Sequence, residues 1–308
     1  MKLLLHDASE ARPDGWLGAL RAVLPQADIT VWQAGLPSDC EVALVWNPPQ
    51  QLFDEQPQLR LIFNLGAGVD QLLALRLPPH AKVLRLQDAG MAVQMAEYVC
   101  HALIRWYREL DRYGAQQAQG QWLRHPLQPR ADFTVGLLGL GVLGQRVARA
   151  VQAFEFPLAG WSRTPRQLDG MRCFAGAAGL DAFLATTRML VCLLPLTPQT
   201  RGLLNHERLS RLPRGSYLIN IARGALVVED ALRALLDSGH IAGAALDVMA
   251  EEPLPAGHWM WTHPRVVLTP HISGMTRRDA AAAQVAQALQ AHAAGAPLPG
   301  QVDLARGY

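Results

Sequence analysis

Three polar residues stand directly after apolar runs of the kind that form buried strands, and their types suit one kind of chemistry. They are Arg223 in LINIARGALV, Glu252 in AALDVMAEEPLP and His271 in VVLTPHISG. An arginine binds a carboxylate and polarises the carbonyl beside it, while a histidine donates a proton to the oxygen of a carbonyl that is being reduced. A carboxylate next to the histidine orients the imidazole and favours its protonated form. The set predicts reduction of a 2-oxo acid by hydride transfer.

A glycine-rich turn predicts where the hydride comes from. Gly139, Gly141 and Gly144 form G-x-G-x-x-G between an apolar run and an amphipathic stretch. The first glycine permits a tight turn, the second lets a pyrophosphate approach the backbone, and the third lets helix and strand pack closely. The helix would begin at Val142 and Leu143, with its positive end toward the phosphates. An ordinary strand-to-helix turn is the alternative, but the context favours a dinucleotide site.

The next apolar run indicates which dinucleotide this is. A dinucleotide site usually has an acidic residue about 20 residues after the turn, where it binds the adenosine ribose. Here the run ends instead in Trp161, Ser162, Arg163, Thr164, Pro165 and Arg166. Hydroxyls and paired guanidinium groups suit a 2′-phosphate, so we expect NADP rather than NAD. The alternatives are that both arginines are solvated surface residues, and that Trp161 fills the core instead of packing near the adenine.

The elements that position these residues form two series of apolar runs separated by helical or turn segments, as in parallel α/β sheets. The first series comprises residues 2–6, 28–32, 41–46, 59–65 and 82–86. The second comprises residues 133–141, 156–161, 188–194, 216–221, 244–248 and 265–270. Apolar residues three and four apart predict one long helix over 92–117, which could bridge domains or dimerise, and a last helix over 276–295.

These series predict an α/β protein with two domains. We expect a Rossmann-type doubly wound parallel sheet over residues 99–272, inserted in a smaller, flavodoxin-like α/β substrate domain. The substrate domain would contain residues 1–98 and 273–308. No strand follows the last helix, so we expect that helix to return to the first domain.

Composition excludes several other classes of protein. The 308 residues include 28 basic and 26 acidic ones mixed along the chain, a balance that does not favour binding to nucleic acid or to an anionic membrane. No apolar run reaches the roughly 20 residues of a membrane span, and MKLLLHD becomes polar too early for a signal peptide. We therefore expect a cytoplasmic protein. The four cysteines lie far apart and are predicted to be reduced core thiols.

Several segments resemble those of a known family. The glycine turn, NIARG at 220–224, EPLP at 252–255 and TPH at 269–271 occur in the order and at the separations found in the D-isomer-specific 2-hydroxyacid dehydrogenases. The resemblance extends to VWNPP at 45–49, LGAGVD at 65–70, DAGMAVQMAEY at 88–98, FPLAGWSR at 156–163 and the final GQVDLARGY. It covers essentially the whole chain. It implies NADPH-dependent reduction of glyoxylate to glycolate and of hydroxypyruvate to D-glycerate, in a cytoplasmic homodimer.

The resemblance also implies roles for individual residues. It assigns substrate binding to Arg223, the general acid to His271 and the partner of that histidine to Glu252. The further residues that it implies for the substrate are Trp46 and the backbone amides of Gly66, Ala67 and Gly68. Those that it implies for the nicotinamide side are Met95, Leu194, Pro195, Ala222 and Asp247. Two alternatives are structural: a tight turn at the glycines and an ordinary apolar helix face at Met95. The role of Asn47 stays open.

Other chemistries find less support in the residues. His258, His263 and His271 match no common metal-ligand spacing, so no metal is predicted. Ser162 and Ser216 lack the G-x-S-x-G context of a serine nucleophile. The HWMWTHP segment is interpreted in three ways: as a cap over the active site, as a contact with a partner subunit, or as core.

Two other functions stay open. One is a dehydrogenase of another D-2-hydroxyacid, larger or phosphorylated, since one sequence does not show the size of the pocket. The other is a cofactor-sensing binding protein that regulates transcription, because the same fold serves different functions. The simultaneous presence of Arg223, Glu252 and His271 favours the enzyme.

Overall fold

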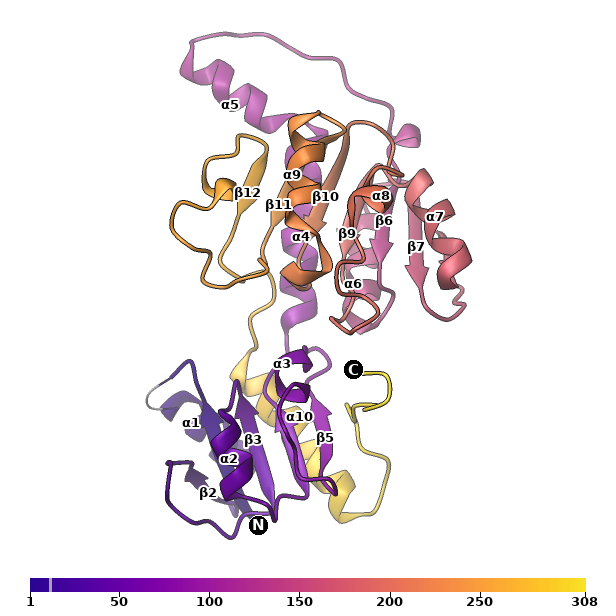
Figure 1. The fold of residues 1–308 in the computed structure, drawn as a ribbon. Helices are drawn as coiled ribbons and strands as arrows, with labels where there is room; N and C mark the ends of the chain where they lie inside the picture. Colours follow the sequence, from indigo (N-terminus) through magenta and orange to yellow (C-terminus); the bar gives the residue numbers. More distant parts are fainter. Residues whose placement is uncertain (11–12) are drawn as a thin grey trace. The chain divides into compact units, whose positions relative to one another are not determined.

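The structure, a computed structural model, describes residues 1–10 and 13–308, which form two α/β units (Figure 1). The first unit comprises Met1–Gly90 and Thr276–Tyr308, and the second comprises Met91–Met275. These boundaries lie a few residues from those expected at 98 and 273. The difference arises at helix α4 (Met91–Tyr107), whose apolar side packs in a core of the second unit from Met95 onward.

The first unit contains a five-stranded parallel sheet. Its strands lie in the order β2-β1-β3-β4-β5, the flavodoxin-like order. The strands are β1 (Lys2–Asp7), β2 (Asp28–Val31), β3 (Val42–Trp46), β4 (Leu61–Asn64) and β5 (Lys82–Arg85). The helices are α1 (Asp14–Val23), α2 (Gln50–Glu55), α3 (Asp70–Leu73) and α10 (Arg278–Ala293). Each strand of the first series lies within a predicted apolar run, or within one residue of it.

The C-terminal segment completes this unit. Helix α10 packs against α1 (Figure 1), and its alanine-rich sequence buries small side chains there, among them Ala281 and Ala282. Beyond the helix, the chain runs beside β5, where the amide of Val302 donates a hydrogen bond of 2.8 Å to the carbonyl of Val83. Residues 276–308 thus cover a sheet that is built from the start of the chain.

The second unit contains a seven-stranded parallel sheet in the order β12-β11-β10-β9-β6-β7-β8. Its strands are β6 (Val135–Leu138), β7 (Leu158–Ser162), β8 (Met171–Ala175), β9 (Met189–Cys192), β10 (Ser216–Asn220), β11 (Ile241–Leu246) and β12 (Val266–Leu268). Besides α4, its helices are α5 (Leu110–Ala118), α6 (Val142–Gln152), α7 (Gly176–Thr186), α8 (His206–Leu209), α9 (Glu229–Asp237) and the 3-10 turns η1 (Arg130–Asp132), η2 (Gly224–Leu226) and η3 (Trp259–Trp261). This is the doubly wound order, which reverses between β6 and β9.

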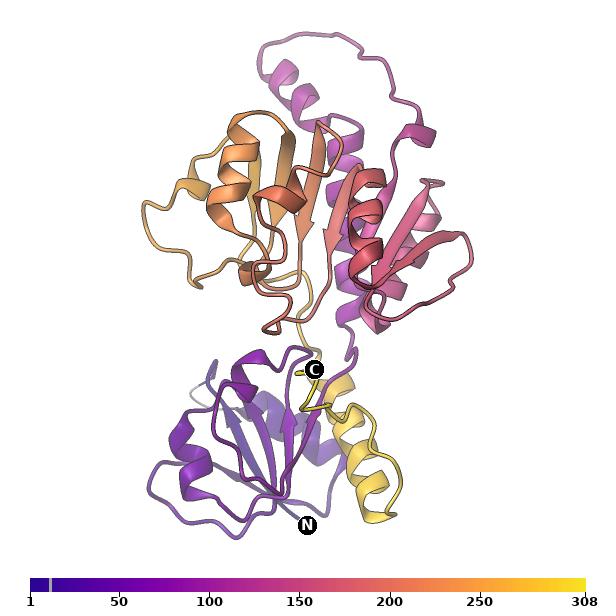
Figure 2. The same cartoon turned by 45° about the vertical axis from the view of Figure 1, so that its right-hand side comes forward.

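Alternate strand residues enter two hydrophobic cores, one on each face of this sheet. Met189 and Val191 pack in the core that includes α4 and α6, whereas Leu190 and Cys192 pack in the core that includes α7, α8 and α9. Figure 2 shows helices in front of and behind the strands. Because both faces are covered, the strands consist of nearly continuous apolar runs. The predicted fold class is confirmed.

Two elements differ from the sequence-based expectation. Strand β8 was not predicted, because MRCFA at this sheet edge is partly exposed and has no continuous apolar run. The expected helix over 92–117 is broken into α4 and α5, since Glu109 adopts a left-handed backbone with φ +52°. An ion pair of 2.7 Å between Arg105 and Asp111 spans the break. Among the described residues, no helix combines the length and the apolarity needed to cross a membrane.

Candidate active site

The glycine turn lies between β6 and α6, at the carboxyl edge of the second sheet. Gly139 has φ +118°, a conformation that residues with a side chain rarely adopt. A Cβ atom on Gly144 would lie 2.1 Å from the carbonyl oxygen of Gly139, so α6 reaches the turn only because residue 144 has no side chain. Among the described residues, no atom lies within 4 Å of the corresponding position on Gly141. The turn therefore fits a pyrophosphate at the helix N-terminus.

Strand β7 leads to the two arginines that were expected near a 2′-phosphate. Arg163 and Arg166 are both exposed, and the sequence from 158 to 168 contains no acidic residue. An acidic side chain here would repel a phosphate, whereas guanidinium groups bind it. The segment fits the phosphorylated dinucleotide better than the unphosphorylated one.

The two residues before the arginines are more buried. Trp161 is 8% exposed, belongs to a hydrophobic core and donates a hydrogen bond of 2.9 Å from Nε1 to the carbonyl of Gly176. The hydroxyl of Ser162 donates to the carbonyl of Thr164 at 2.8 Å. These contacts are those of a core residue and a turn residue, so they favour the structural alternative for Trp161.

Arg223 follows β10 in a turn that Asn220 stabilises. The Nδ2 group of Asn220 donates to the carbonyl of Arg223 at 2.9 Å, and its Oδ1 accepts from the amide of Ala222 at 3.2 Å. Because Asn220 is only 1% exposed, this turn is tied to the interior of the sheet. Arg223 itself is partly buried, and its guanidinium donates to the carbonyl of Ala222 at 2.8 Å.

His271 and Glu252 form a direct pair. Nδ1 of His271 lies 2.8 Å from Oε2 of Glu252, and the two side chains are 42% and 34% exposed. A carboxylate only accepts, so the proton of this bond is on Nδ1, and the Nε2 atom of the ring is left for chemistry. The backbone of His271 has φ +54°, and its amide donates to the carbonyl of Asp247 at 2.8 Å.

The surroundings of Glu252 keep it ionised. Partial burial raises the pKa of this carboxyl. The hydrogen bonds from His271 and from the amide of Met249, together with the charges of His271 and Arg223, lower the pKa by more than burial raises it. The net pKa lies below its ordinary value of 4.5. An anionic Glu252 accepts the Nδ1 proton of His271 and thereby orients the ring. The structure thus brings Arg223, Glu252 and His271 together within the second unit.

Asp247 supports the turn that carries the histidine. Its buried carboxylate accepts hydrogen bonds from the hydroxyl of Thr269 at 2.6 Å, the amide of Ile272 at 2.9 Å and the amide of Ser273 at 2.8 Å. The hydroxyl of Tyr98, on α4, lies 2.8 Å from that of Thr269. Because Thr269 donates to Asp247, Tyr98 donates to Thr269. Sequence reasoning missed Tyr98 and Thr269, since only the fold brings them beside Asp247.

The other residues expected near the nicotinamide occupy the same edge of the second sheet or pack close to it. Met95 is 7% exposed, belongs to the core and packs closely on Gly274. Leu194 is buried after β9, and the carbonyl of Pro195 accepts from the hydroxyl of Thr200 at 2.7 Å. Core packing is a sufficient explanation for Met95 in this structure.

In the first unit, side chains bind the carbonyl groups of the loop after β4. Asn64 donates from Nδ2 to the carbonyls of Gly66 and Gly68 at 3.0 and 2.9 Å, and Arg85 donates to the carbonyl of Ala67 at 3.3 Å. In the described part of the chain, no acceptor binds the amides of residues 66–68. With the carbonyls bound and the amides available, three consecutive N–H groups can hold a carboxylate.

Trp46 and Arg85 shape this loop. A Cβ atom on Gly66 would lie 2.2 Å from the ring of Trp46, so the indole packs directly on the glycine backbone. Burial lowers the pKa of Arg85, and the charge of Tyr308 offsets part of this effect. The guanidinium of an arginine stays protonated near neutral pH even when its pKa is lowered. Arg85 and Asn64 were not predicted, because neither lies in a motif. Asn47, whose role was open, is exposed and has φ +45°.

Comparison with known proteins identifies the family. Residues 100–273 match the sequence profile described as D-isomer specific 2-hydroxyacid dehydrogenase, NAD binding domain. Over 314 aligned residues the chain is 44% identical to glyoxylate/hydroxypyruvate reductase A of Yersinia enterocolitica, with 99% of both chains covered. The chain belongs to the D-isomer-specific 2-hydroxyacid dehydrogenases.

Solved structures of other family members have the same fold. A D-isomer specific 2-hydroxyacid dehydrogenase of Xanthobacter autotrophicus Py2, in complex with NADPH and MES, superposes with a TM-score of 0.94 at 42% identity and covers 100% of this chain and 99% of its own. An NADPH-dependent glyoxylate/hydroxypyruvate reductase of Sinorhizobium meliloti, in complex with NADP and sulfate, gives a TM-score of 0.93 at 34% identity, with the same coverage.

The other two histidines considered as metal ligands, His258 and His263, lie beside carboxylates. His258 lies 3.3 Å from Glu229 and His263 lies 3.2 Å from Asp237. Among the described residues, no group of three or more histidines, cysteines, aspartates or glutamates is placed to bind a metal ion.

Proposed function

We propose that this family member is an NADPH-dependent reductase of glyoxylate and hydroxypyruvate, forming glycolate and D-glycerate. The observation that carries the proposal is the placement of Arg223 with the 2.8 Å His271–Glu252 pair after neighbouring strands of a sheet that also bears the glycine turn. The names of the Yersinia and Sinorhizobium relatives support the substrates, and the bound cofactors of the solved relatives support NADPH.

The residues have complementary tasks in the proposed reaction. NADPH, when bound, supplies the hydride that adds to the carbonyl carbon of the 2-oxo acid. Arg223 binds the carboxylate and polarises the carbonyl. His271 gives a proton from Nε2 to the carbonyl oxygen as negative charge develops there. Glu252 accepts from Nδ1, orients the ring and stabilises its charged form.

The cofactor is held by the glycine turn and by the end of β7. Gly141 leaves room for the pyrophosphate, Gly139 and Gly144 permit the turn and the close approach of α6, and the amide end of α6 faces the phosphates. Arg163 and Arg166 bind the 2′-phosphate, which selects NADPH over NADH. The absence of an acidic residue at this strand end supports that selection.

Assembly and location are part of the proposal. We propose a homodimer, supported by the large exposed apolar side chains of Trp122, Leu123 and Leu127 in the segment after α5. Light scattering should give twice the mass of one chain; a monomeric mass would contradict the dimer.

We propose the cytoplasm as the location, since all four cysteines are free thiols. Cell fractionation with an antibody would test this.

Steady-state kinetics on a panel of 2-oxo acids test the function. Glyoxylate, hydroxypyruvate, pyruvate and a phosphorylated 2-oxo acid are each assayed with NADPH and with NADH. The proposal expects the highest kcat/KM for glyoxylate or hydroxypyruvate with NADPH. A preference for the phosphorylated acid would support the alternative dehydrogenase. Tight NADPH binding without turnover of any 2-oxo acid would support the cofactor-sensing protein instead.

A further inference from the structure

The segment over residues 248–265 connects β11 to β12 and carries Glu252. Two histidine–carboxylate contacts attach it to α9, the first at the start of that helix and the second at its end. The two attachments have similar chemistry, since each joins a histidine of the segment to a carboxylate of the helix. They differ in their distance along the chain from Glu252.

Glu229, the first residue of α9, makes the first attachment with both carboxylate oxygens. Oε1 accepts from the amide of Ala250 at 3.1 Å, and Oε2 lies 3.3 Å from Nε2 of His258. Nδ1 of His258 accepts from the amide of Met260 at 3.4 Å, so the ring proton is on Nε2 and is donated to Glu229. The side chains of Glu229 and His258 are 23% and 22% exposed, which limits competition from water. Glu229 thus binds the chain on both sides of Glu252.

The peptide between Met249 and Ala250 connects this attachment to the catalytic candidates. On one side it packs against Gly224, where a Cβ atom would lie 1.9 Å from the carbonyl carbon of Met249. The amide of Met249 donates to Oε1 of Glu252 at 2.9 Å. Through the preceding peptide Met249 contacts Glu252, the partner of His271, while the 249–250 peptide contacts Glu229 and Gly224, the residue next to Arg223 in the chain. Movement of this peptide would change the spacing between the arginine and the histidine–glutamate pair.

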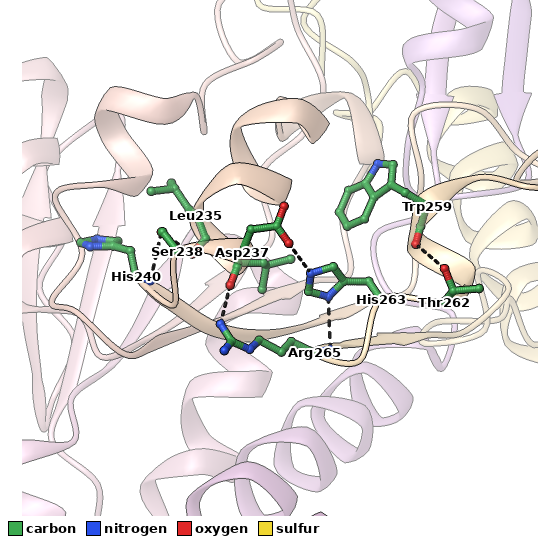
Figure 3. Close-up of polar contacts among 9 residues, drawn as sticks. Leu235, Asp237, Ser238, His240, Trp259, Thr262, His263 and Arg265 are labelled. Carbon is green, nitrogen blue, oxygen red and sulfur yellow. Dashed lines mark hydrogen bonds and ion pairs between the residues drawn. The ribbon is translucent and has the colours of Figure 1, made fainter.

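The second attachment is shown in Figure 3. His263 lies 3.2 Å from Oδ1 of Asp237, the last residue of α9, and Nδ1 of His263 accepts from the amide of Arg265 at 3.2 Å. The guanidinium of Arg265 donates to the carbonyl of Leu236, and the ring of Trp259 meets that of His263 edge-on at 5.5 Å. This cluster secures the tryptophan-containing end of the segment to the helix C-terminus. None of its contacts involves Glu252 or the 249–250 peptide.

We propose that Glu229 is a positioning residue of the active site, which sets the distance and orientation of the Glu252–His271 pair relative to Arg223 through Ala250 and His258. The inference rests on the proposed function, because it assigns Glu252 and His271 to proton donation. In this proposal the first residue of α9, Glu229, positions the active site, whereas its last residue, Asp237, contributes only to the stability of the fold. A misplacement of about 1 Å costs up to about a hundredfold in rate, so the effect is measurable.

The test compares Glu229→Ala and Glu229→Gln with the matched control Asp237→Asn at the other attachment. We expect Glu229→Ala to lower kcat about tenfold or more, with the NADPH Kd unchanged, and to move the high-pH loss of kcat to lower pH. Glu229→Gln should have a smaller effect in the same direction, since one amide oxygen can still accept from Ala250 but the other group cannot accept from His258. Asp237→Asn should leave kcat and the pH profile unchanged, whatever its effect on Tm.

Glu252→Gln distinguishes failure of this inference from failure of the proposed function. The proposed function expects Glu252→Gln to move the pH profile downward, and the inference expects no further shift when Glu229→Ala is added to it. A Glu252→Gln enzyme with a wild-type profile would overturn the proposed function. If Glu252→Gln moves the profile while both Glu229 variants keep wild-type kcat and pH dependence, the positioning role is overturned. An equal loss of kcat in Asp237→Asn would also overturn it, because the effect would then be general destabilisation.

Discussion

His271 has a left-handed backbone, its amide binds the carbonyl of the buried Asp247, and its ring is partly exposed. This arrangement is expected of a side chain that is positioned for chemistry and not for packing. His271→Ala removes the proton donor and leaves the glycine turn unchanged. We expect kcat with glyoxylate to fall on the order of a hundredfold or more, while the Kd for NADPH, followed by fluorescence, stays nearly constant. A near wild-type kcat would mean that the proton comes from another group.

The carboxyl of Glu252 has a lowered pKa in the folded protein, and this predicts how its contribution to stability depends on pH. A group with a depressed pKa stabilises the folded state above its unfolded value, here near 4.5, and the stabilisation is lost as the pH falls through the folded value. We expect the difference in free energy of unfolding between wild type and Glu252→Gln to be smaller about one unit below pH 4.5 than about one unit above it. Urea denaturation at both pH values measures this difference. An equal or larger difference at the lower pH would contradict the assigned direction.

Arg163 and Arg166 are exposed at the end of β7, and the segment 158–168 contains no acidic residue. Changing both to alanine should raise the KM for NADPH about tenfold or more, because charge-assisted hydrogen bonds contribute roughly 1.5 to 3 kcal/mol each. The KM for NADH should change little, since NADH has no 2′-phosphate. The KM for NADH, measured in the same variant, serves as the control for general damage to the cofactor site. A wild-type protein that prefers NADH would refute the assignment.

Helix α6 depends on one glycine for its approach to the sheet edge. A Cβ atom on Gly144 would lie 2.1 Å from the carbonyl oxygen of Gly139, and backbone atoms cannot move aside as a flexible side chain does. We expect Gly144→Ala to lower the free energy of unfolding by about 1–3 kcal/mol and to weaken NADPH binding, because the helix start shifts away from the turn. Gly114→Ala in α5 is a suitable control, since nothing lies within 4 Å of its Cβ position among the described residues. Equal behaviour of the two variants would show that α6 tolerates the shift.

The two units differ in how the chain builds them, and this predicts how fragments behave. The second unit is continuous from Met91 to Met275, whereas the first needs both Met1–Gly90 and Thr276–Tyr308. A fragment of residues 91–275 should unfold cooperatively and bind NADPH. A fragment of residues 1–90 should not fold alone, since it lacks α10 and the chain that pairs with β5 at Leu84 and Gln301. Circular dichroism and urea titration of both fragments test this, and a cooperatively folded 1–90 fragment would contradict it.

Much of the molecule could be predicted from local patterns. The glycine turn, the apolar strand runs and the positions of Arg223, Glu252 and His271 after them are each encoded within a few consecutive residues, because strand burial and turn conformation depend on near neighbours. The two sheets and their helices followed from those runs. The partly exposed β8 and the break at Glu109 did not, since neither has a strong periodic signal.

The supports of the candidate site could not be predicted in this way. Tyr98 reaches Thr269 across 171 positions, and Glu229 reaches Ala250 across 21. Asn64 and Arg85 bind the carbonyls of the 66–68 loop from different strands. Glu229, Asn64 and Arg85 lie in none of the family-like segments, and these contacts form only when folding brings distant groups within hydrogen-bond distance. The sequence indicates which groups are candidates for the chemistry, because their types and positions after strands are local features, and long-range packing determines their geometry.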